Sequence, residues 1–314
     1  MTKVVALAGG VGGAKLVYGL ANTLPAEDLT VIVNTGDDFE HFGLNICPDL
    51  DTVMYNLAEI SNEQNGWGRQ DETWNCFSEL EKLESENWFQ LGDRDLATHL
   101  ERTKLLRSGF NLTDVTEILC HKLGVDVCVR PMSDQSVHTI VTTKEYGDLP
   151  FQEYFVKHHF EPEYISHRFF GSYTAKINPK TREALTNADM VIICPSNPWL
   201  SIMPILAVED MRQLISQKVC VAVSPIVGHD AIKGPAAKMF HEMNITPSAY
   251  EVAKIYQGLI DGFVMDNLNS SECDLVVACG IIPMLTDTIM KDKNSKERLA
   301  KEIFDFASQL KKGN

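Results

Sequence analysis

Short apolar runs alternate with amphipathic segments at the start of the chain, and this alternation predicts the fold class. Residues 4–8 form a continuous apolar run, residues 15–23 repeat apolar side chains at helical spacing, and residues 30–34 form a second run. Strands that are apolar on both faces and alternate with helices indicate a parallel sheet covered by helices. We therefore expect an α/β protein.

The same alternation returns late in the chain. Residues 190–194 and 219–223 are apolar runs that stop at loops rich in proline and glycine. Residues 262–265 and 275–279 are predicted as further strands. Residues 295–311 carry an apolar stripe at helical spacing, which predicts a closing amphipathic helix.

The middle of the chain has a different character. Residues 73–123 are predicted to be helical, and from residue 125 to about 177 short β-branched and aromatic runs, such as 137–143 and 151–156, predict strands. We find no internal repeat and no linker. We therefore predict an α/β nucleotide-binding core made of residues 1–65 and 180–314, with residues 66–179 as a smaller inserted helical and mixed β domain.

Charge and composition narrow the function. The chain of 314 residues has 28 Lys and Arg against 43 Asp and Glu, a formal net charge of −15, so it lacks the basic surface of a nucleic-acid binder. The sequence contains no run of about 18 uncharged apolar residues, which a membrane span would need, and the N-terminus does not resemble a signal peptide. The eight cysteines have no zinc-ligand spacing and are expected to be reduced. We expect a cytoplasmic protein.

A glycine-rich loop joins the first predicted strand to the first predicted helix. It contains Gly9, Gly10, Gly12, Gly13 and Lys15. Backbone N–H groups at such a helix start can hold a phosphate. The loop is neither a dinucleotide fingerprint, which needs Gly or Ala at position 15, nor a Walker A motif, which needs Gly-Lys-Ser/Thr. We expect phosphate binding, with a turn that needs glycine only for packing as the alternative.

Four aspartates lie close together in the sequence. Asp37 and Asp38 follow the second predicted strand, and Asp49 and Asp51 lie at the start of the next helix. Brought to one sheet edge, they would form an oxygen-rich pocket suited to Mg²⁺. Helix capping by Asp49 or Asp51, with a turn at Asp37 and Asp38, explains the same residues. The residues alone leave both interpretations open.

Two further segments combine charged and aromatic side chains. Residues 91–99 contain Arg94 and His99 at a loop-to-helix junction, where helix capping and a surface ion pair are the simpler explanation. Trp67, Arg69 and Trp74 are suited to stacking on a planar ring, although such aromatic residues more often belong to a core. His99 and His229 are the histidines that we consider candidates for a site.

Segments spread over nearly the whole chain occur in an order that is typical of one enzyme family. They are GGVGGAK (9–15), NTGDD (34–38), PDLDT (48–52), GWGR (66–69), ETW (72–74), LGDRDLATH (91–99), PMSD (131–134), PSNP (195–198), SPI (224–226) and GPA (234–236). In this ordered set the chain resembles the 2-phospho-L-lactate and phosphoenolpyruvate transferases of coenzyme F420 biosynthesis.

The resemblance implies a Rossmann-like α/β core with a smaller inserted domain, and a specific reaction. Members of that family transfer a phosphorylated three-carbon acid from a guanosine-diphospho-linked donor to the terminal ribityl hydroxyl of the deazaflavin Fo. They release GMP and use Mg²⁺. The partners implied are therefore small molecules, with no nucleic acid and no membrane, and a homodimer is the expected assembly.

The resemblance also implies roles for particular residues. Asp37 and Asp51, with Asp38 as a further candidate, are expected to bind the metal. Asp51 is also the candidate general base near the Fo hydroxyl, and Arg94 is expected to face Fo or the phosphate. The donor is expected at the glycine loop and Lys15, and at a second set of loop residues: Ser196, Asn197, Pro198, Gly228 and Gly234.

Two other functions fit part of the pattern. A non-catalytic regulator of the same superfamily that binds nucleotide sugars would share the glycine loop and residues 195–198, but it would not need residues 67–74 and 91–99 to fit a deazaflavin. A nicotinamide dehydrogenase is disfavoured by Lys15 and by Asn34, which stands where an acidic residue is expected. The sequence leaves three acids open: phospholactate, phosphoenolpyruvate and 3-phosphoglycerate.

Overall fold

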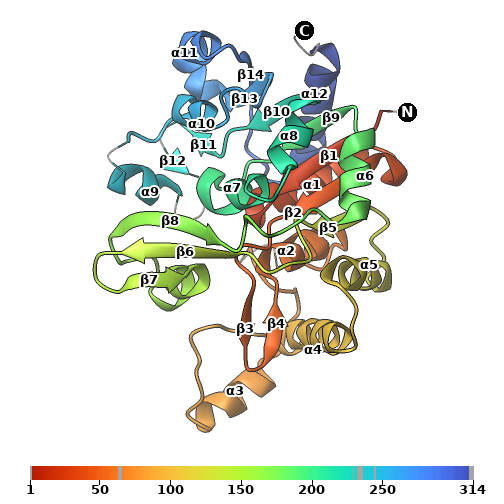
Figure 1. Ribbon diagram of the computed structural model, residues 1–314, viewed down its shortest axis with the longest axis vertical. Coiled ribbons are helices and arrows are strands. Elements are labelled where there is room, and N and C mark those ends of the chain that lie inside the picture. The colour runs from red at the N-terminus through yellow and green to blue at the C-terminus, as the bar shows by residue number, and fades with distance from the viewer. Residues whose placement is uncertain (1, 63–65, 229, 232–235, 244, 311–314) are drawn as a thin grey trace.

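A seven-stranded parallel sheet forms the centre of the protein. The computed structural model describes residues 2–62, 66–228, 230–231, 236–243 and 245–310. The strand order is β14-β13-β10-β9-β1-β2-β5 (Figure 1). The strands are β1 (Val4–Ala8), β2 (Leu29–Val33), β5 (Cys128–Pro131), β9 (Met190–Ile193), β10 (Val219–Val223), β13 (Gly262–Asp266) and β14 (Ile282–Thr286). All neighbouring pairs are parallel, which confirms the predicted α/β class.

Helices cover both faces of this sheet, because its central strands are apolar on both sides. The first face carries α1 (Gly10–Thr23), α2 (Pro48–Leu57), α5 (Leu112–Lys122) and α12 (Lys293–Gln309). The second carries α6 (Pro179–Asn187), α7 (Met203–Leu206), α8 (Met211–Ser216) and α10 (Ala249–Ile255). Alternate residues of β1 point into the two cores, with Ala6 on the first face and Leu7 on the second. The core is therefore Rossmann-like.

The order of the strands reverses at the centre of the sheet. From β1 the chain builds outward through β2 to β5, and it then returns to the other side of β1 with β9. The carboxyl ends of β1 and β9 therefore flank a topological switch point, which is where open α/β sheets bind ligands.

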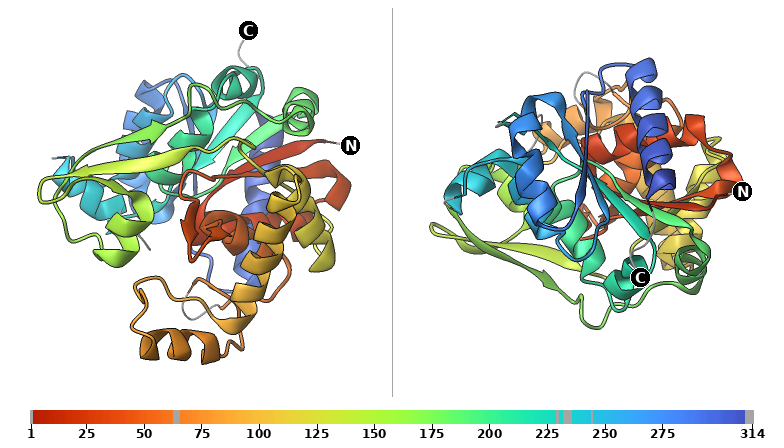
Figure 2. Two further views of the ribbon diagram at one scale, coloured as in Figure 1. Left: turned by 60° about the horizontal axis from the view of Figure 1, so that its bottom comes forward. Right: turned by 90° about the horizontal axis from the view of Figure 1, so that it is seen from above.

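Two excursions from the sheet overhang this edge. The first contains the hairpin of β3 (Phe39–His41) and β4 (Leu44–Ile46), α3 (Asn75–Lys82) and α4 (Asp93–Arg107), which extend away from the core (Figure 2). The second is an antiparallel sheet of β6 (His138–Thr143), β7 (Gly147–Pro150) and β8 (Tyr164–Phe170).

The remaining elements are short. They are η1 (Ala26–Asp28), η2 (Glu153–Lys157), η3 (Pro198–Ile202), β11 (Ile226–Val227), β12 (Asp230–Ala231), α9 (Ala236–Glu242), η4 (Asn267–Glu272) and α11 (Cys273–Ala278). Within the described residues, we find no helix with the length and apolar character needed to cross a bilayer.

The structure differs from the predicted boundaries at β5. This strand lies within residues 66–179, which the sequence predicts as an inserted domain, yet it pairs with β2 at the edge of the core sheet. The β2–β5 connection carries α3, α4 and α5, and the β5–β9 connection carries the antiparallel sheet. The additions to the core are therefore two excursions rather than one insertion.

Two predicted strands are wrong. Residues 275–279 belong mostly to α11, where only Val276 faces the core, and the strand follows at β14. Residues 151–156 lead into the π-helix η2, where Phe151 and Phe155 stack with ring centroids 5.4 Å apart. Their spacing of four residues is typical of a helix. The strand prediction was based on the enrichment in aromatic residues and did not take this spacing into account.

The packing of α1 on α12 depends on Gly19. A Cβ at this position would overlap the backbone carbonyl oxygen of Lys296. Replacing glycine by alanine inside a helix normally stabilises it by about 0.5–1 kcal/mol. We expect Gly19→Ala to destabilise the fold instead, by about 1–3 kcal/mol, because the two helices must move apart.

Thermal unfolding measures this effect, and Asn22→Ala on the exposed side of the same helix serves as the control. The control is expected to change the free energy of unfolding by no more than about 0.5 kcal/mol. A Gly19→Ala protein that melts at or above the native temperature would show that the helices tolerate a methyl group here.

Candidate functional site

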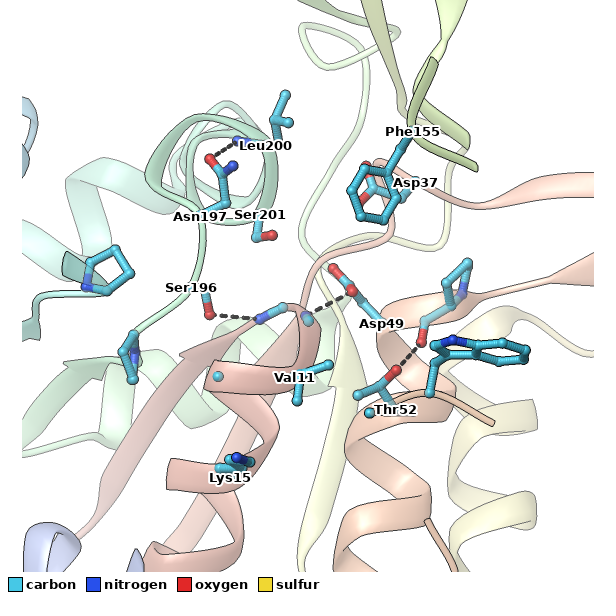
Figure 3. A pocket seen from close by; sticks show the side chains of 18 of the residues that line it. Val11, Lys15, Asp37, Asp49, Thr52, Phe155, Ser196, Asn197, Leu200 and Ser201 are labelled. Atoms are coloured by element: carbon cyan, nitrogen blue, oxygen red, sulfur yellow. Dashed lines mark hydrogen bonds between the residues drawn. The ribbon is translucent and has the colours of Figure 1, made fainter. Parts of the chain in front are cut away.

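A large cavity opens at the carboxyl ends of the central strands. Its volume is about 950 Å³, within the range that small-molecule sites occupy. The segments after β1, β2, β9 and β10 contribute to its wall, together with residues 288–291 before α12. Figure 3 shows the part of the cavity around the start of α1. The cavity therefore lies at the switch point of the sheet.

The glycine loop lies at the bottom of this cavity. Gly9, Gly10, Val11 and Gly12 line it, and their loop opens α1. The first N–H groups of a helix have no acceptor within the helix, so this end favours an anion. One of them, the Gly10 N–H, donates to Asp49 Oδ1 at 2.7 Å. Lys15, one turn further on, also lines the cavity, and its Nζ donates to the carbonyl oxygen of Met290 at 3.2 Å.

The glycines are also required for packing. A Cβ on Gly12 would overlap the carbonyl oxygen of Pro195, and a Cβ on Gly13 would lie 2.5 Å from Ser196 Oγ. Gly10 has φ +64°, a conformation that L side chains rarely adopt. Packing and backbone conformation therefore require glycine at these positions, and they leave a helix start that faces the cavity.

Two carboxylates come together at the same place. Asp37, in the loop after β2, and Asp49, at the start of α2, both line the cavity. Asn34 Nδ2 lies 3.2 Å from Asp37 Oδ2 and 2.9 Å from Asp49 Oδ2. Ser201 Oγ lies close by, because a Cβ on Gly9 would be 2.6 Å from Asp49 Oδ2 and 3.1 Å from Ser201 Oγ.

The environment of these carboxylates opposes ionisation. Burial, the negative charge of Asp49 and that of Asp38 raise the pKa of Asp37 well above its usual value. Burial also raises the pKa of Asp49 to about 6, although the bonds from Asn34 and Gly10 lower it. The pair therefore needs either protons or a cation to offset its charge.

This pair is suited to Mg²⁺ that is also bound by substrate. Among the described residues there is no group of three or more His, Cys, Asp or Glu side chains that would hold a metal by themselves. Mg²⁺ is commonly held by one or two carboxylates together with substrate phosphates and water. Asp37 and Asp49 satisfy that requirement, beside a helix end that favours an anion.

Asp51 faces a different environment. Both of its carboxylate oxygens accept hydrogen bonds from the guanidinium of Arg102, which is 2% exposed. His99 Nδ1 lies 3.7 Å from Asp51, and His99 Nε2 lies 3.3 Å from Asp95. Residues two apart on a helix point about 200° apart, so Asp49 and Asp51 cannot both face the cavity. The metal and general-base roles of Asp51 stay predictions, as does the metal role of Asp38, whose pKa burial raises.

The acidic residues around Arg94 serve as helix caps. Asp93 accepts from the N–H groups of Asn75 and Cys76 at the start of α3. Glu72 accepts from the N–H groups of Arg94 and Asp95 at 2.8 Å each. Capping therefore occurs at this junction, but Glu72 caps α4 and Asp93 caps α3, whereas Asp95 accepts from the Tyr55 hydroxyl. The Arg94 side chain is exposed and does not line the cavity, so its role in the reaction stays a prediction.

The predicted donor-binding loops are also structural. Ser196 Oγ accepts from Gly9 N–H at 3.1 Å, and Asn197 Oδ1 accepts from the N–H groups of Trp199 and Leu200 at the start of η3. Ser196 and Asn197 line the cavity, whereas Pro198 is buried as the first residue of η3. Gly228 has φ +63° and is bonded to Asn269, away from the cavity wall. Gly234 and His229 lie outside the described residues.

Five aromatic side chains, here called the aromatic wall, also line the cavity, and most of them were not predicted. Its members are Trp67, Trp88, Phe89, Phe151 and Phe155. Trp67 is the one sequence-predicted stacking residue that lines the cavity; Trp74 does not. The Arg69 guanidinium packs over the Tyr55 ring at 5.7 Å instead. The helical spacing of Phe151 and Phe155 was the available signal for this wall.

The two kinds of aspartate predict opposite effects on stability. In EDTA at pH 7.5, above the pKa of Asp49, burial and the Asp49 charge oppose ionisation of Asp37 in the folded state, and Asp37→Asn removes this ionisable group. We expect Asp37→Asn to raise the melting temperature. Because the folded-state pKa of Asp49 is raised to about 6, the native protein should lose stability as pH rises through about 4 to 6, and the raised pKa of Asp37 should add to this loss.

Asp51→Asn is the matched control, because it makes the same change of aspartate to asparagine on α2, the helix that also carries Asp49. It leaves the buried Arg102 guanidinium without its counter-charge, and we expect a loss of about 3–5 kcal/mol. Melting curves of both variants, with and without Mg²⁺, decide the point. Equal destabilisation by the two changes would mean that Asp37 is also compensated in the folded protein.

Comparison with known proteins identifies the family. The family model described as 2-phospho-L-lactate transferase CofD matches residues 4–298. A phosphoenolpyruvate transferase of Streptomyces griseus is 40% identical over 316 residues, covering 98% of this chain and 99% of the relative. A 2-phospho-L-lactate transferase of Methanosarcina barkeri is 38% identical over 300 residues, covering 96% and 97%. The solved structure of protein BH3568 from Bacillus halodurans has the same fold, with a TM-score of 0.70 at 15% identity, covering 96% of this chain and 99% of that chain. The chain therefore belongs to the 2-phospho-L-lactate transferase CofD family and is a transferase.

Proposed function

We propose that the protein transfers a phosphorylated three-carbon acid from a guanosine-diphospho-linked donor to the deazaflavin Fo, with release of GMP, in coenzyme F420 biosynthesis. One observation carries the proposal: a single cavity combines an anion-favouring helix start, an acidic pair and an aromatic wall. The relatives are named phosphoenolpyruvate transferase and 2-phospho-L-lactate transferase, and both names support a phosphorylated three-carbon acid as the group that is transferred.

The donor diphosphate fits the start of α1. Backbone N–H groups at Val11 and Gly12 favour an anion there, and Lys15 adds a positive charge to the same wall. The loops after β9 and β10, with Ser196, Asn197 and Ser224, offer hydrogen-bonding groups to the guanosine. In a protein with a net charge of −15, these local groups make a polyanion acceptable at this place.

The deazaflavin ring system fits the aromatic wall. A planar ring gains about 1–3 kcal/mol from stacking on an aromatic side chain. Trp67 and Phe155 lie on this wall. Fo bound here would direct its ribityl chain toward the acidic pair. A regulator that binds nucleotide sugars has no need for such a wall.

The reaction joins the terminal oxygen of Fo to the phosphorus that carries the acid and breaks the bond from that phosphorus to GMP. Mg²⁺, held by Asp37 and Asp49 and by the donor phosphates, would neutralise the charge that develops on the phosphate oxygens. The glycine loop would orient the donor. The proton of the attacking hydroxyl must pass to a base, and among the described residues the carboxylates that line the cavity are Asp37 and Asp49.

Mass spectrometry of the product tests the proposed reaction directly. The purified protein is incubated with Fo, Mg²⁺ and, separately, the guanosine-diphospho-linked forms of phospholactate, phosphoenolpyruvate and 3-phosphoglycerate. We expect GMP and a phosphodiester-linked Fo product with at least one donor, and the mass of that product identifies the acid. Absence of an Fo product with all three donors would rule out the proposed reaction.

Two tryptophans in one segment test the place of Fo. Trp67 lines the cavity, whereas Trp74 lies outside it at the start of α3 and is 36% exposed. We expect Trp67→Ala to raise the dissociation constant of Fo by about tenfold, the equivalent of 1.4 kcal/mol, while Trp74→Ala leaves it within about twofold. Quenching of Fo fluorescence measures both. Equal affinities in the two variants would remove Fo from this wall.

A further inference from the structure

Asn34 connects the two carboxylates of the cavity. It directly follows β2 and is fully buried, with no exposed surface. Its Oδ1 accepts the N–H of Gly36 at 2.8 Å. Its Nδ2 faces the other way, 3.2 Å from Asp37 Oδ2, 2.9 Å from Asp49 Oδ2 and 3.4 Å from the carbonyl oxygen of Leu200.

The arrangement requires an amide. A side chain at this position must accept from Gly36 on one side and donate to carboxylates on the other, and among side chains of this length only asparagine offers both. Asp37 and Asp49 come from different elements, a loop and the start of α2, so the chain does not hold them together by itself. Asn34 projects from the end of a central strand, which is the most rigid support available near the cavity.

We propose that Asn34 is a positioning residue: its amide sets the separation of Asp37 and Asp49 and thereby the affinity of the pair for a divalent cation. The inference rests on the proposed function for the role of that cation. In metal sites, groups that hold the ligands in place typically contribute 10–100-fold to metal affinity.

A purely structural role is the alternative, because the bond to Gly36 also shapes the turn of residues 34–38. Asn178 provides a matched control for that role. Its Oδ1 accepts a backbone N–H two residues later, that of Lys180, at 2.9 Å, and its Nδ2 donates to a carboxylate, that of Asp134. It makes the same kinds of bond at the start of α6, outside the cavity wall. Loss of structure alone affects stability at both positions.

The experiment measures Mn²⁺ binding to the full-length protein by electron paramagnetic resonance, without substrate and with GDP, in the native protein, Asn34→Ala and Asn178→Ala. We expect Asn34→Ala to raise the dissociation constant of Mn²⁺ at least about tenfold. The Mg²⁺ concentration that gives half-maximal transfer should rise by a similar factor, with the KM for Fo unchanged. Asn178→Ala should lower the melting temperature without changing Mn²⁺ binding.

A second variant keeps the inference testable if Asn34→Ala does not fold. Asn34→Ser retains a hydroxyl that can accept from Gly36 or donate to one carboxylate, and we expect an Mn²⁺ affinity between those of the native and alanine proteins. Native Mn²⁺ affinity in the Asn34 variants, or no Mn²⁺ binding by the native protein, would overturn the inference. The expected pattern of Mn²⁺ binding in a protein that transfers nothing to Fo would instead overturn the proposed function and leave the role of Asn34 intact.

Discussion

The hydrogen bonds of the Asp49 carboxylate hold the site together. Asp49 Oδ1 accepts from Gly10 at the start of α1, and its Oδ2 accepts from Asn34 at the end of β2. The Asp49 side chain, at the start of α2, thereby connects the start of α1, which follows β1, to the end of β2. The close approach also explains why residue 9 is glycine, since a Cβ there would lie 2.6 Å from Asp49 Oδ2 and 2.7 Å from Ser201 Cβ. The end of the cavity at the glycine loop is thus organised by the buried carboxylate of Asp49.

The start of α2 separates two carboxylates by function. Asp51 is compensated by Arg102 within a buried network that also contains His99, Asp95 and Tyr55. Asp49 and Asp37 have hydrogen-bond donors, but burial and the neighbouring negative charges of Asp49 and Asp38 raise the pKa of Asp37. Removal of one partner from a buried ion pair is strongly destabilising, whereas buried carboxylates without a counter-charge oppose folding and persist where function requires them. The segment 48–52 therefore contains one aspartate suited to structure and one suited to chemistry.

The sequence allowed the fold to be predicted where a local pattern decides it. Continuous apolar runs identified β1, β2, β9, β10 and β13, because a strand buried on both faces needs no partner to be recognised. The strand prediction for residues 275–279 was wrong, because a short apolar run fits a helix with one buried side chain equally well. The position of β5 in the core sheet depends on pairing with β2, a contact between distant segments that no local pattern encodes.

The site was predicted to the level of segments and not of side chains. The glycine loop, Asp37, Asp49 and residues 195–197 line the cavity, since the carboxyl ends of parallel strands meet at one edge. Which aspartate of residues 48–52 faces the cavity depends on how α2 is rotated about its axis, and the packing of Leu50, Val53 and Met54 against the sheet decides that rotation. From the sequence, Asn34 was important only because a dehydrogenase would have an acidic residue at that position. Its role as a hydrogen-bond donor could not be predicted, because it depends on two carboxylates that other elements bring to it.

If the proposed function is correct, the cavity links the binding of cation and donor. A donor diphosphate alone would add negative charge next to Asp37 and Asp49, and a cation alone would find two carboxylates and water. Each ligand supplies the charge that the other needs, so each must raise the affinity of the site for the other by the same factor. The acidic pair would then disfavour a diphosphate that arrives without its metal and would favour the complete complex. A site with a third carboxylate would hold the cation without the donor and would lose that dependence. The buried side chain next to Asp37 and Asp49 is the neutral amide of Asn34, which adds no third negative charge to the pair.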